Sequence, residues 1–167
     1  MKKLLFILIL SGLSLNLFAS EEFLEKFNTT ASTLNKYASS VTLSAMKERD
    51  NQGNELDTVC KEAVSTAGKV VSMDDLEKVI ILENNIDKTI SSIEHKRKKL
   101  IDFFAALNDI YDKTCASNRA SECSDAHSTL NSTTFSVLEA TTAIDSYISD
   151  LRTYSEEVEK FISTIEY

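Results

Sequence analysis

Two of the three cysteines, Cys115 and Cys123, are spaced for a disulfide bond. They flank a polar stretch, residues 116–122, that separates two long segments with a helical pattern. In an exported protein a disulfide at this place would close the tip of a helical hairpin. Because the closed loop is short, the bond should stabilise the fold by only about 2–3 kcal/mol. The alternative is that both thiols stay unpaired.

The third cysteine, Cys60, belongs to a segment whose helical register places it far from the other two. If its helix folds back at Ser72, the distance to Cys115 along the bundle is about 40 Å at the helical rise. The α-carbons of a disulfide lie within about 7 Å of each other. We therefore expect Cys60 to be buried on the apolar face of its helix. An intermolecular bridge is the alternative for an odd cysteine in a secreted chain.

The two histidines, His95 and His127, do not belong to a recognised catalytic or metal-binding motif. Neither follows a Glu at the Glu-x-x-His spacing of di-iron bundles, and there is no His-Glu-x-x-His or Cys-x-x-Cys-His pattern. His127 together with Cys115 and Cys123 would offer three metal ligands and no fourth. Glycine is too scarce for a phosphate-binding loop. We expect no enzyme activity, no metal and no cofactor.

A basic run from His95 to Lys99 stands out in an acidic chain. Consecutive helical residues point about 100° apart, so the run wraps around its helix. If the chain reverses near residue 119, Arg97 should pair with Asp145, and Lys98 or Lys99 with Glu139. Charge runs on helices usually serve such pairing and solubility. Replacing Lys96, Lys98 and Lys99 by Gln should therefore barely change stability. The functional alternative is that Lys96, Lys98 and Lys99 bind an acidic partner.

The first residues have the layout of a secretory signal peptide. Lys2 and Lys3 precede an apolar run, and small residues follow at Ala19 and Ser20. We expect cleavage after Ala19, which makes residues 1–19 a signal peptide and residues 20–167 a single helical domain located in the periplasm or at the bacterial cell surface. An uncleaved membrane anchor is the alternative, but the apolar run is shorter than the roughly 20 residues that cross a bilayer.

The composition excludes several classes of partner and fold. The net charge is −8, and cleavage would make the chain two charges more negative. Such a surface repels phosphate backbones and anionic membranes, so we expect no nucleic-acid partner and no membrane anchor after cleavage. The chain has three glycines and no proline, whereas sheets with tight turns need several of both. The sequence therefore predicts an all-α fold.

Heptad patterns predict a long C-terminal helical hairpin. Its second helix should cover residues 125–166, with an unbroken apolar stripe: Leu130, Val137, Ile144, Leu151, Val158 and Ile165. Its first helix should cover residues 73–115, beginning after the N-cap Ser72 with Asp74 and Asp75 in the first turn. The buried face predicted for this helix is apolar except at one position, which is occupied by Arg97.

The N-terminal part predicts a helix over residues 21–48, a turn at residues 50–54 and a shorter helix up to about Val70. The turn rests on the cluster Asp50, Asn51, Gln52, Gly53 and Asn54. The predicted architecture is an elongated antiparallel bundle of three to four helices with coiled-coil spacing.

A polar seam is expected between the first and last helices. Thr133, Thr134 and Thr141 begin the last helix opposite a helix rich in serine and threonine. The seam is either a cleft or a polar packing layer. The aromatic line Tyr147, Tyr154 and Phe161 has heptad spacing and should be core.

These observations favour an exported, non-enzymatic, protein-binding helical bundle. Such a protein could be an accessory subunit of a secretion or surface assembly, an adhesin-like protein, or a periplasmic inhibitor or immunity protein. Its protein partner is not identified by the sequence, and association of the chain with itself stays open. The alternative function is a periplasmic carrier or sensor that binds a small ligand in the polar seam.

Overall fold

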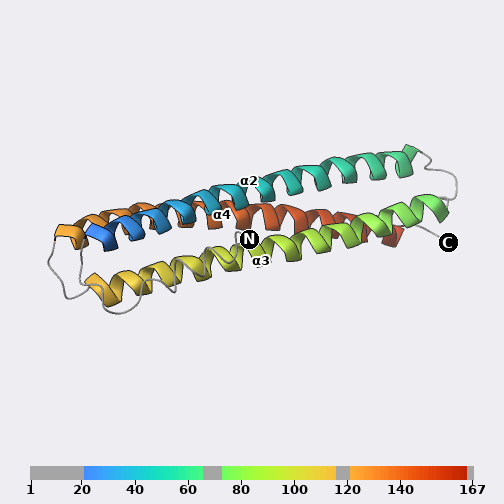
Figure 1. The fold of residues 1–167 in the computed structure, drawn as a ribbon. Coiled ribbons are helices and arrows are strands. Elements are labelled where there is room, and N and C mark those ends of the chain that lie inside the picture. The colour runs from blue at the N-terminus through green and yellow to red at the C-terminus, as the bar shows by residue number, and fades with distance from the viewer. Residues whose placement is uncertain (1–20, 66–72, 116–120, 165–167) are drawn as a thin grey trace. The chain divides into compact units, whose positions relative to one another are not determined.

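The structure is a computed structural model that describes residues 21–65, 73–115 and 121–164, with the side chains of residues 60–65 left out. These residues form three α-helices that pack against each other: α2 (Glu21–Ser65), α3 (Met73–Cys115) and α4 (Ser121–Thr164) (Figure 1). No strand occurs in the described ranges. The all-α prediction is confirmed. The predicted signal peptide, the predicted helix end near Val70, Ser72 and Ile165 lie outside the described residues, as does the side chain of Cys60, whose backbone belongs to α2.

The predicted turn at residues 50–54 is wrong, because α2 continues through it without a break (Figure 1). The helix therefore does not end at Glu48, and the described chain has three helices where a fourth was allowed. Tertiary contacts override the turn-forming composition here. Arg49 binds Asp150 of α4 at 3.0 Å, and Gly53 lies directly against the ring of Tyr154. With no proline in the segment, nothing sterically prevents the helix from continuing.

The bounds of the other two helices agree closely with the sequence pattern. α3 begins at Met73 and ends at Cys115, as predicted, with Asp74 and Asp75 in its first turn. α4 begins at Ser121 rather than at residue 125, so the cysteine loop is shorter than expected. Cys123 is consequently a helical residue in the first turn of α4.

The packing of the helices divides the chain into two compact units. The described part of the first unit consists of residues 21–40, 98–115 and 121–140. That of the second unit consists of residues 41–65, 73–97 and 141–164. Each unit contains a segment of all three helices, with its own core.

In the first unit α3 and α4 are antiparallel, whereas α2 and α4 run in the same direction. The antiparallel pair is shown by the disulfide Cys115–Cys123 and by the contact of Tyr111 with His127. The core of this unit contains Phe23, Phe27, Leu34, Leu100, Leu107, Ala126, Leu130 and Val137. Burying a large apolar side chain of this kind contributes about 1.5–3 kcal/mol.

The second unit repeats the same pairing directions. Arg97 and Glu94 of α3 reach Asp145 and Arg152 of α4, which confirms the antiparallel register. Its core contains Val41, Ala45, Leu56, Val79, Leu82, Ile86, Ile93, Ile144, Ile148, Leu151 and Val158. Most of these residues belong to the apolar ladders that the sequence shows, so the periodicity identifies the buried faces correctly.

Candidate functional site

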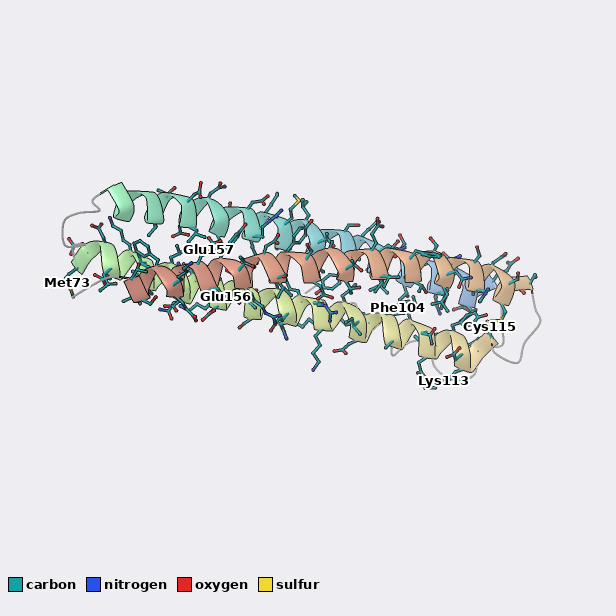
Figure 2. The ribbon with its side chains drawn as sticks, turned by 180° about the vertical axis from the view of Figure 1, so that it is seen from behind. Met73, Phe104, Lys113, Cys115, Glu156 and Glu157 are labelled. Atoms are coloured by element: carbon teal, nitrogen blue, oxygen red, sulfur yellow. A yellow bond between two sulfur atoms is a disulfide. The ribbon has the colours of Figure 1, made fainter. Side chains whose placement is uncertain are left out.

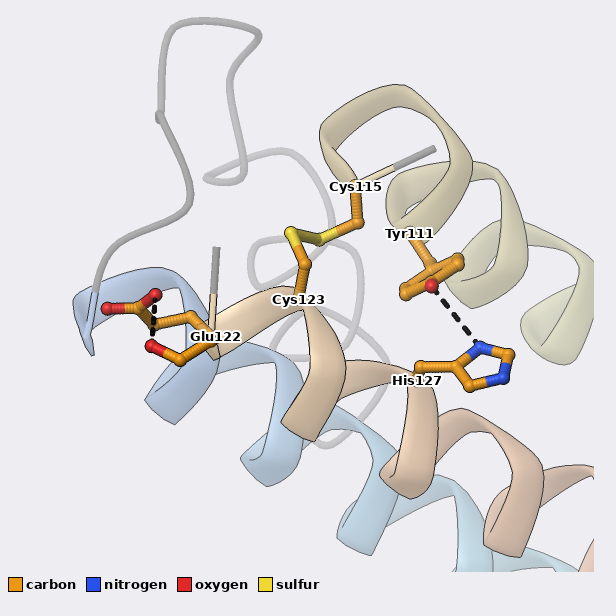
Figure 3. The surroundings of a disulfide bond; sticks show 6 residues. Tyr111, Cys115, Glu122, Cys123 and His127 are labelled. Carbon is orange, nitrogen blue, oxygen red and sulfur yellow. Dashed lines mark hydrogen bonds between the residues drawn. A yellow bond between two sulfur atoms is a disulfide. The ribbon is translucent and has the colours of Figure 1, made fainter. Parts of the chain in front are cut away.

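The disulfide Cys115–Cys123 joins the C-terminal end of α3 to the first turn of α4 (Figure 3). The two α-carbons are 5.4 Å apart, and both cysteines are buried. The predicted disulfide is confirmed. Because both sulfur atoms are in the bond, neither is a free thiolate that could bind a metal together with His127.

His127 contacts a phenol across the helical hairpin. Its Nδ1 is 3.2 Å from Oη of Tyr111, and the two ring centroids are 5.8 Å apart (Figure 3). The ring centroid of Tyr111 is in turn 6.2 Å from that of the buried Phe27 on α2. The imidazole therefore takes part in a contact that joins the three helices of the first unit. The heptad pattern does not reveal this pair, because Tyr111 reads there as an apolar core position.

No cluster suited to a metal ion is formed in the parts of the chain that the structure describes: no group of three or more His, Cys, Asp or Glu side chains comes together in that way. His95, the other histidine, is exposed on α3.

The structure separates the three lysines that the sequence groups together. Lys96 belongs to the second unit, where its Nζ binds Glu48 Oε1 at 2.9 Å and Ser44 Oγ at 3.1 Å on α2. Lys98 and Lys99 belong to the first unit; Lys98 is exposed and Lys99 is half-buried. Neither forms an ion pair with Glu139 or another described carboxylate. Lys98 is thus the most available cation of the run, and Lys96 the least.

Arg97 pairs with Asp145, as its position opposite α4 predicts. Nε of Arg97 is 2.6 Å from Oδ1 of Asp145, and its Nη2 donates to Oδ2 at 2.8 Å. The same layer of the second unit contains Arg49, whose guanidinium lies 4.9 Å from the ring centroid of Tyr147 and binds Asp150. These ion pairs link α2 and α3 to α4 within the second unit.

The predicted polar seam exists in the first unit, between α2 and α4. It forms a groove of about 390 Å³ lined by Asn28, Ala31, Ser32, Asn35, Ser128, Thr129, Ser132 and Thr133. Thr129 Oγ1 donates to Asn28 Oδ1 at 2.7 Å, and Asn35 Nδ2 lies 3.5 Å from Oγ1 of the fully buried Thr133. Asn35 Oδ1 is buried without a hydrogen-bond donor among the described residues. The lining carries no formal charge.

A second groove, of about 460 Å³, lies between α3 and α4 in the second unit. Its charged lining residues are Asp87, Arg152 and Glu156, and Arg152 is already paired with Glu94 at 2.8 Å. Figure 2 labels Glu156 beside Glu157 on α4, and both carboxylates are exposed. A groove with mixed and partly paired charges offers no defined recognition chemistry.

An exposed apolar pair on α4 is the feature that the periodicity did not single out. In the first unit, Phe135 is 72 % exposed and Leu138 is 60 % exposed, one helical turn apart. The outward stripe to which they belong carries no charge and consists of Ser124, Ser128, Asn131, Phe135 and Leu138, all exposed. The sequence signal is an aromatic residue outside the heptad core positions, within a run of polar side chains.

Ile101 on α3 extends this surface. Ile101, Asn108 and Cys115 recur at heptad spacing, so Ile101 lies on the stripe of α3 that carries the disulfide to α4. In the antiparallel register set by Tyr111 and His127, Ile101 is level with Leu138. Its side chain is 39 % exposed. We name Phe135, Leu138 and Ile101 the apolar patch.

None of the described helices has the length and apolar character needed to cross a membrane. Comparison of the chain with protein-family models, with curated proteins and with solved structures finds no match.

Proposed function

We propose that this chain is an exported, non-enzymatic helical bundle that binds another protein through the apolar patch, in the periplasm or at the cell surface. Roles that fit are an accessory subunit of a secretion or surface assembly, an adhesin-like protein, and a periplasmic inhibitor or immunity protein. The single observation that supports the proposal is the exposure of Phe135 and Leu138 on an uncharged stripe of α4.

Exposing the apolar patch to water costs free energy that a binding partner would recover. A large apolar side chain gains about 1.5–3 kcal/mol when it leaves water. Single exposed apolar residues are common on proteins, but adjacent ones surrounded by uncharged polar groups are typical of interaction surfaces. Phe135 and Leu138 are such a pair, and aromatic residues at the centre of an interface tend to dominate its energy.

The test compares capture by the wild-type protein with capture by two serine variants. Phe135→Ser removes the most exposed member of the apolar patch. Leu43→Ser is the matched control, because Leu43 is a similarly exposed apolar residue, at 49 %, on α2 in the second unit. We expect proteins from the host envelope to be retained by the wild-type and control chains and lost by Phe135→Ser. Equal retention by all three would refute a role for the patch.

A second candidate function is supported by the polar seam. A small neutral ligand rich in hydroxyl groups would match the uncharged amide and hydroxyl lining of the groove between α2 and α4. The variant Asn35→Leu with Thr133→Val removes the central polar pair. A carrier would show a thermal shift with neutral sugars or polyols that this variant loses, whereas a packing layer would show no shift in either protein.

A further inference from the structure

We infer that the apolar patch joins two copies of this chain, related by a two-fold axis that runs parallel to α4. The inference rests on the proposed function, because it names the partner that binds the same surface. The patch consists of Phe135 and Leu138 on α4 and of Ile101 on α3, which is level with Leu138. The charges on the two sides of the patch point to a second copy of the chain as the partner.

Lys98 borders the patch on the α3 side. It lies one turn before Ile101 and is exposed, and no ion pair with a described carboxylate engages it. Lys99 points about 160° away from Ile101, on the far side of α3, and Asp102 lies further around the helix from Ile101 than Lys98 does. Lys98 is therefore the charged side chain of α3 that lies nearest to the patch.

Glu139 borders the patch on the other side. It follows Leu138 directly, so it points about 100° further around α4, away from α3. Its carboxylate is exposed and, like Lys98, takes part in no ion pair within the described residues. In the antiparallel register of the first unit, Lys98 and Glu139 are at nearly the same level. The patch thus has a basic border and an acidic border facing each other across apolar side chains.

This arrangement is complementary to itself. A two-fold axis along α4 exchanges the two borders, so that Lys98 of each copy faces Glu139 of the other while the apolar side chains meet between them. A two-fold axis perpendicular to α4 would instead place Lys98 opposite Lys98 and Glu139 opposite Glu139, and such like-charge pairs are unfavourable. In a protein with a net charge of −8, an uncharged stripe is also where two copies approach with the least repulsion.

The size of the surface predicts a weak dimer. The stripe from Ser124 to Leu138 is about 20 Å long at the helical rise. A contact of that length between two helix pairs falls at the low end of specific interfaces, below about 1,200 Å² in total. We therefore expect an equilibrium between monomer and dimer that changes with concentration in the micromolar range, at about 10–100 µM.

Sedimentation equilibrium on the protein purified as its host produces it tests the inference. We expect a monomer–dimer equilibrium that Phe135→Ser weakens at least tenfold and that Leu43→Ser leaves unchanged. Lys98→Glu should weaken the dimer by placing two carboxylates opposite each other. Adding Glu139→Lys to Lys98→Glu should restore it, because the pair is then reversed. Restoration by the double variant is the result that only direct apposition of the two positions explains.

Two outcomes overturn the inference. One is a protein that stays monomeric up to about 1 mM, far above the predicted range. The other is a dimer that is indifferent to both Phe135→Ser and the charge reversal. A photo-crosslinker at position 135 then separates this failure from that of the proposed function. Adducts with a different protein would leave the proposed function standing with another partner, whereas no adduct at all would remove both.

Discussion

Gly53 lies inside α2 with the ring of Tyr154 against it. A Cβ at this position would be 3.0 Å from Oη of Tyr154, closer than ordinary van der Waals contact. Alanine gains about 1 kcal/mol over glycine within a helix. We expect Gly53→Ala to gain less than this in the wild-type protein, because the tyrosine ring must shift. The gain should be larger in a Tyr154→Phe background, where the nearest atom is absent, and urea unfolding of the four proteins would measure the difference. Equal gains in both backgrounds would contradict the contact.

Substitutions of Lys96 and Lys98 should affect stability differently, although the two lysines are only two residues apart. Lys96→Gln leaves the half-buried Glu48 without its ion-pair partner, so stability should fall by roughly 0.5–1 kcal/mol. Lys98→Gln removes an exposed charge and should change stability by less than about 0.5 kcal/mol. The sequence alone predicts little effect for either substitution. Thermal melts at low and high salt would distinguish them, and an identical response would show that the contact with Glu48 contributes nothing.

Tyr37 gives the first unit a specific response to alkaline pH. Burial raises the pKa of the Tyr37 phenol above its usual value, and the ring packs edge-on against Phe103 at 5.8 Å between centroids. The folded protein therefore holds the phenolic proton more tightly than the unfolded chain does. This contribution is complete below about pH 10 and is lost as the pH rises through the folded-state pKa.

We predict that stability falls more steeply above about pH 10 in the wild-type protein than in Tyr37→Phe. Chemical unfolding at a series of alkaline pH values measures both slopes. Absorbance at the tyrosinate band follows the titration independently. Parallel curves for the two proteins would show that Tyr37 titrates at the same pH in the folded and unfolded states.

At the scale of the helices, the disulfide holds the ends of α3 and α4 together. Reduction, or replacement of both Cys115 and Cys123 by serine, should lower stability by about 2–3 kcal/mol, because the unfolded chain regains the entropy of the short loop. The helices themselves should persist, since their buried faces extend far beyond the loop. Circular dichroism melts with and without reductant measure the loss. The double serine variant is the control, and its melting temperature should not respond to reductant.

The sequence predicts α3 almost to the residue, because its start has acidic first-turn residues and its end is marked by a cysteine before a polar stretch. It misplaces a turn within α2, because Asp50, Asn51 and Gly53 favour turns locally while Tyr154 and Asp150, about a hundred residues away, favour a helix. Composition carries no information about such distant contacts. Cys115–Cys123 and Arg97–Asp145 were predictable because antiparallel register follows from a single loop.

The candidate site was less predictable than the fold. The polar seam follows from threonines at heptad positions, and Thr133 is buried there with Asn35 beside it. The sequence pattern does not distinguish Phe135, because periodicity identifies the buried face of a helix and assigns every other position to the solvent-exposed face. The significance of Phe135 and Leu138 depends on which side chains of neighbouring helices fail to cover them, and only the packed structure shows this.

At the scale of the whole molecule, the chain combines a net charge of −8 with an uncharged stripe in its first unit that carries the exposed Phe135 and Leu138. An acidic surface disfavours nucleic acids and anionic lipids as partners, whereas an apolar patch with a positive and a negative border favours another protein. The proposals for protein binding and for self-association therefore both depend on Phe135. This residue is the place to test them together.

The most direct measurement is site-specific photo-crosslinking from position 135 in the living host. We expect discrete adducts from position 135, among them one with twice the mass of the chain, and none from Glu25, an exposed control position on α2 in the same unit. An absence of adducts at position 135, or equal labelling from position 25, would contradict the claim that this surface binds protein.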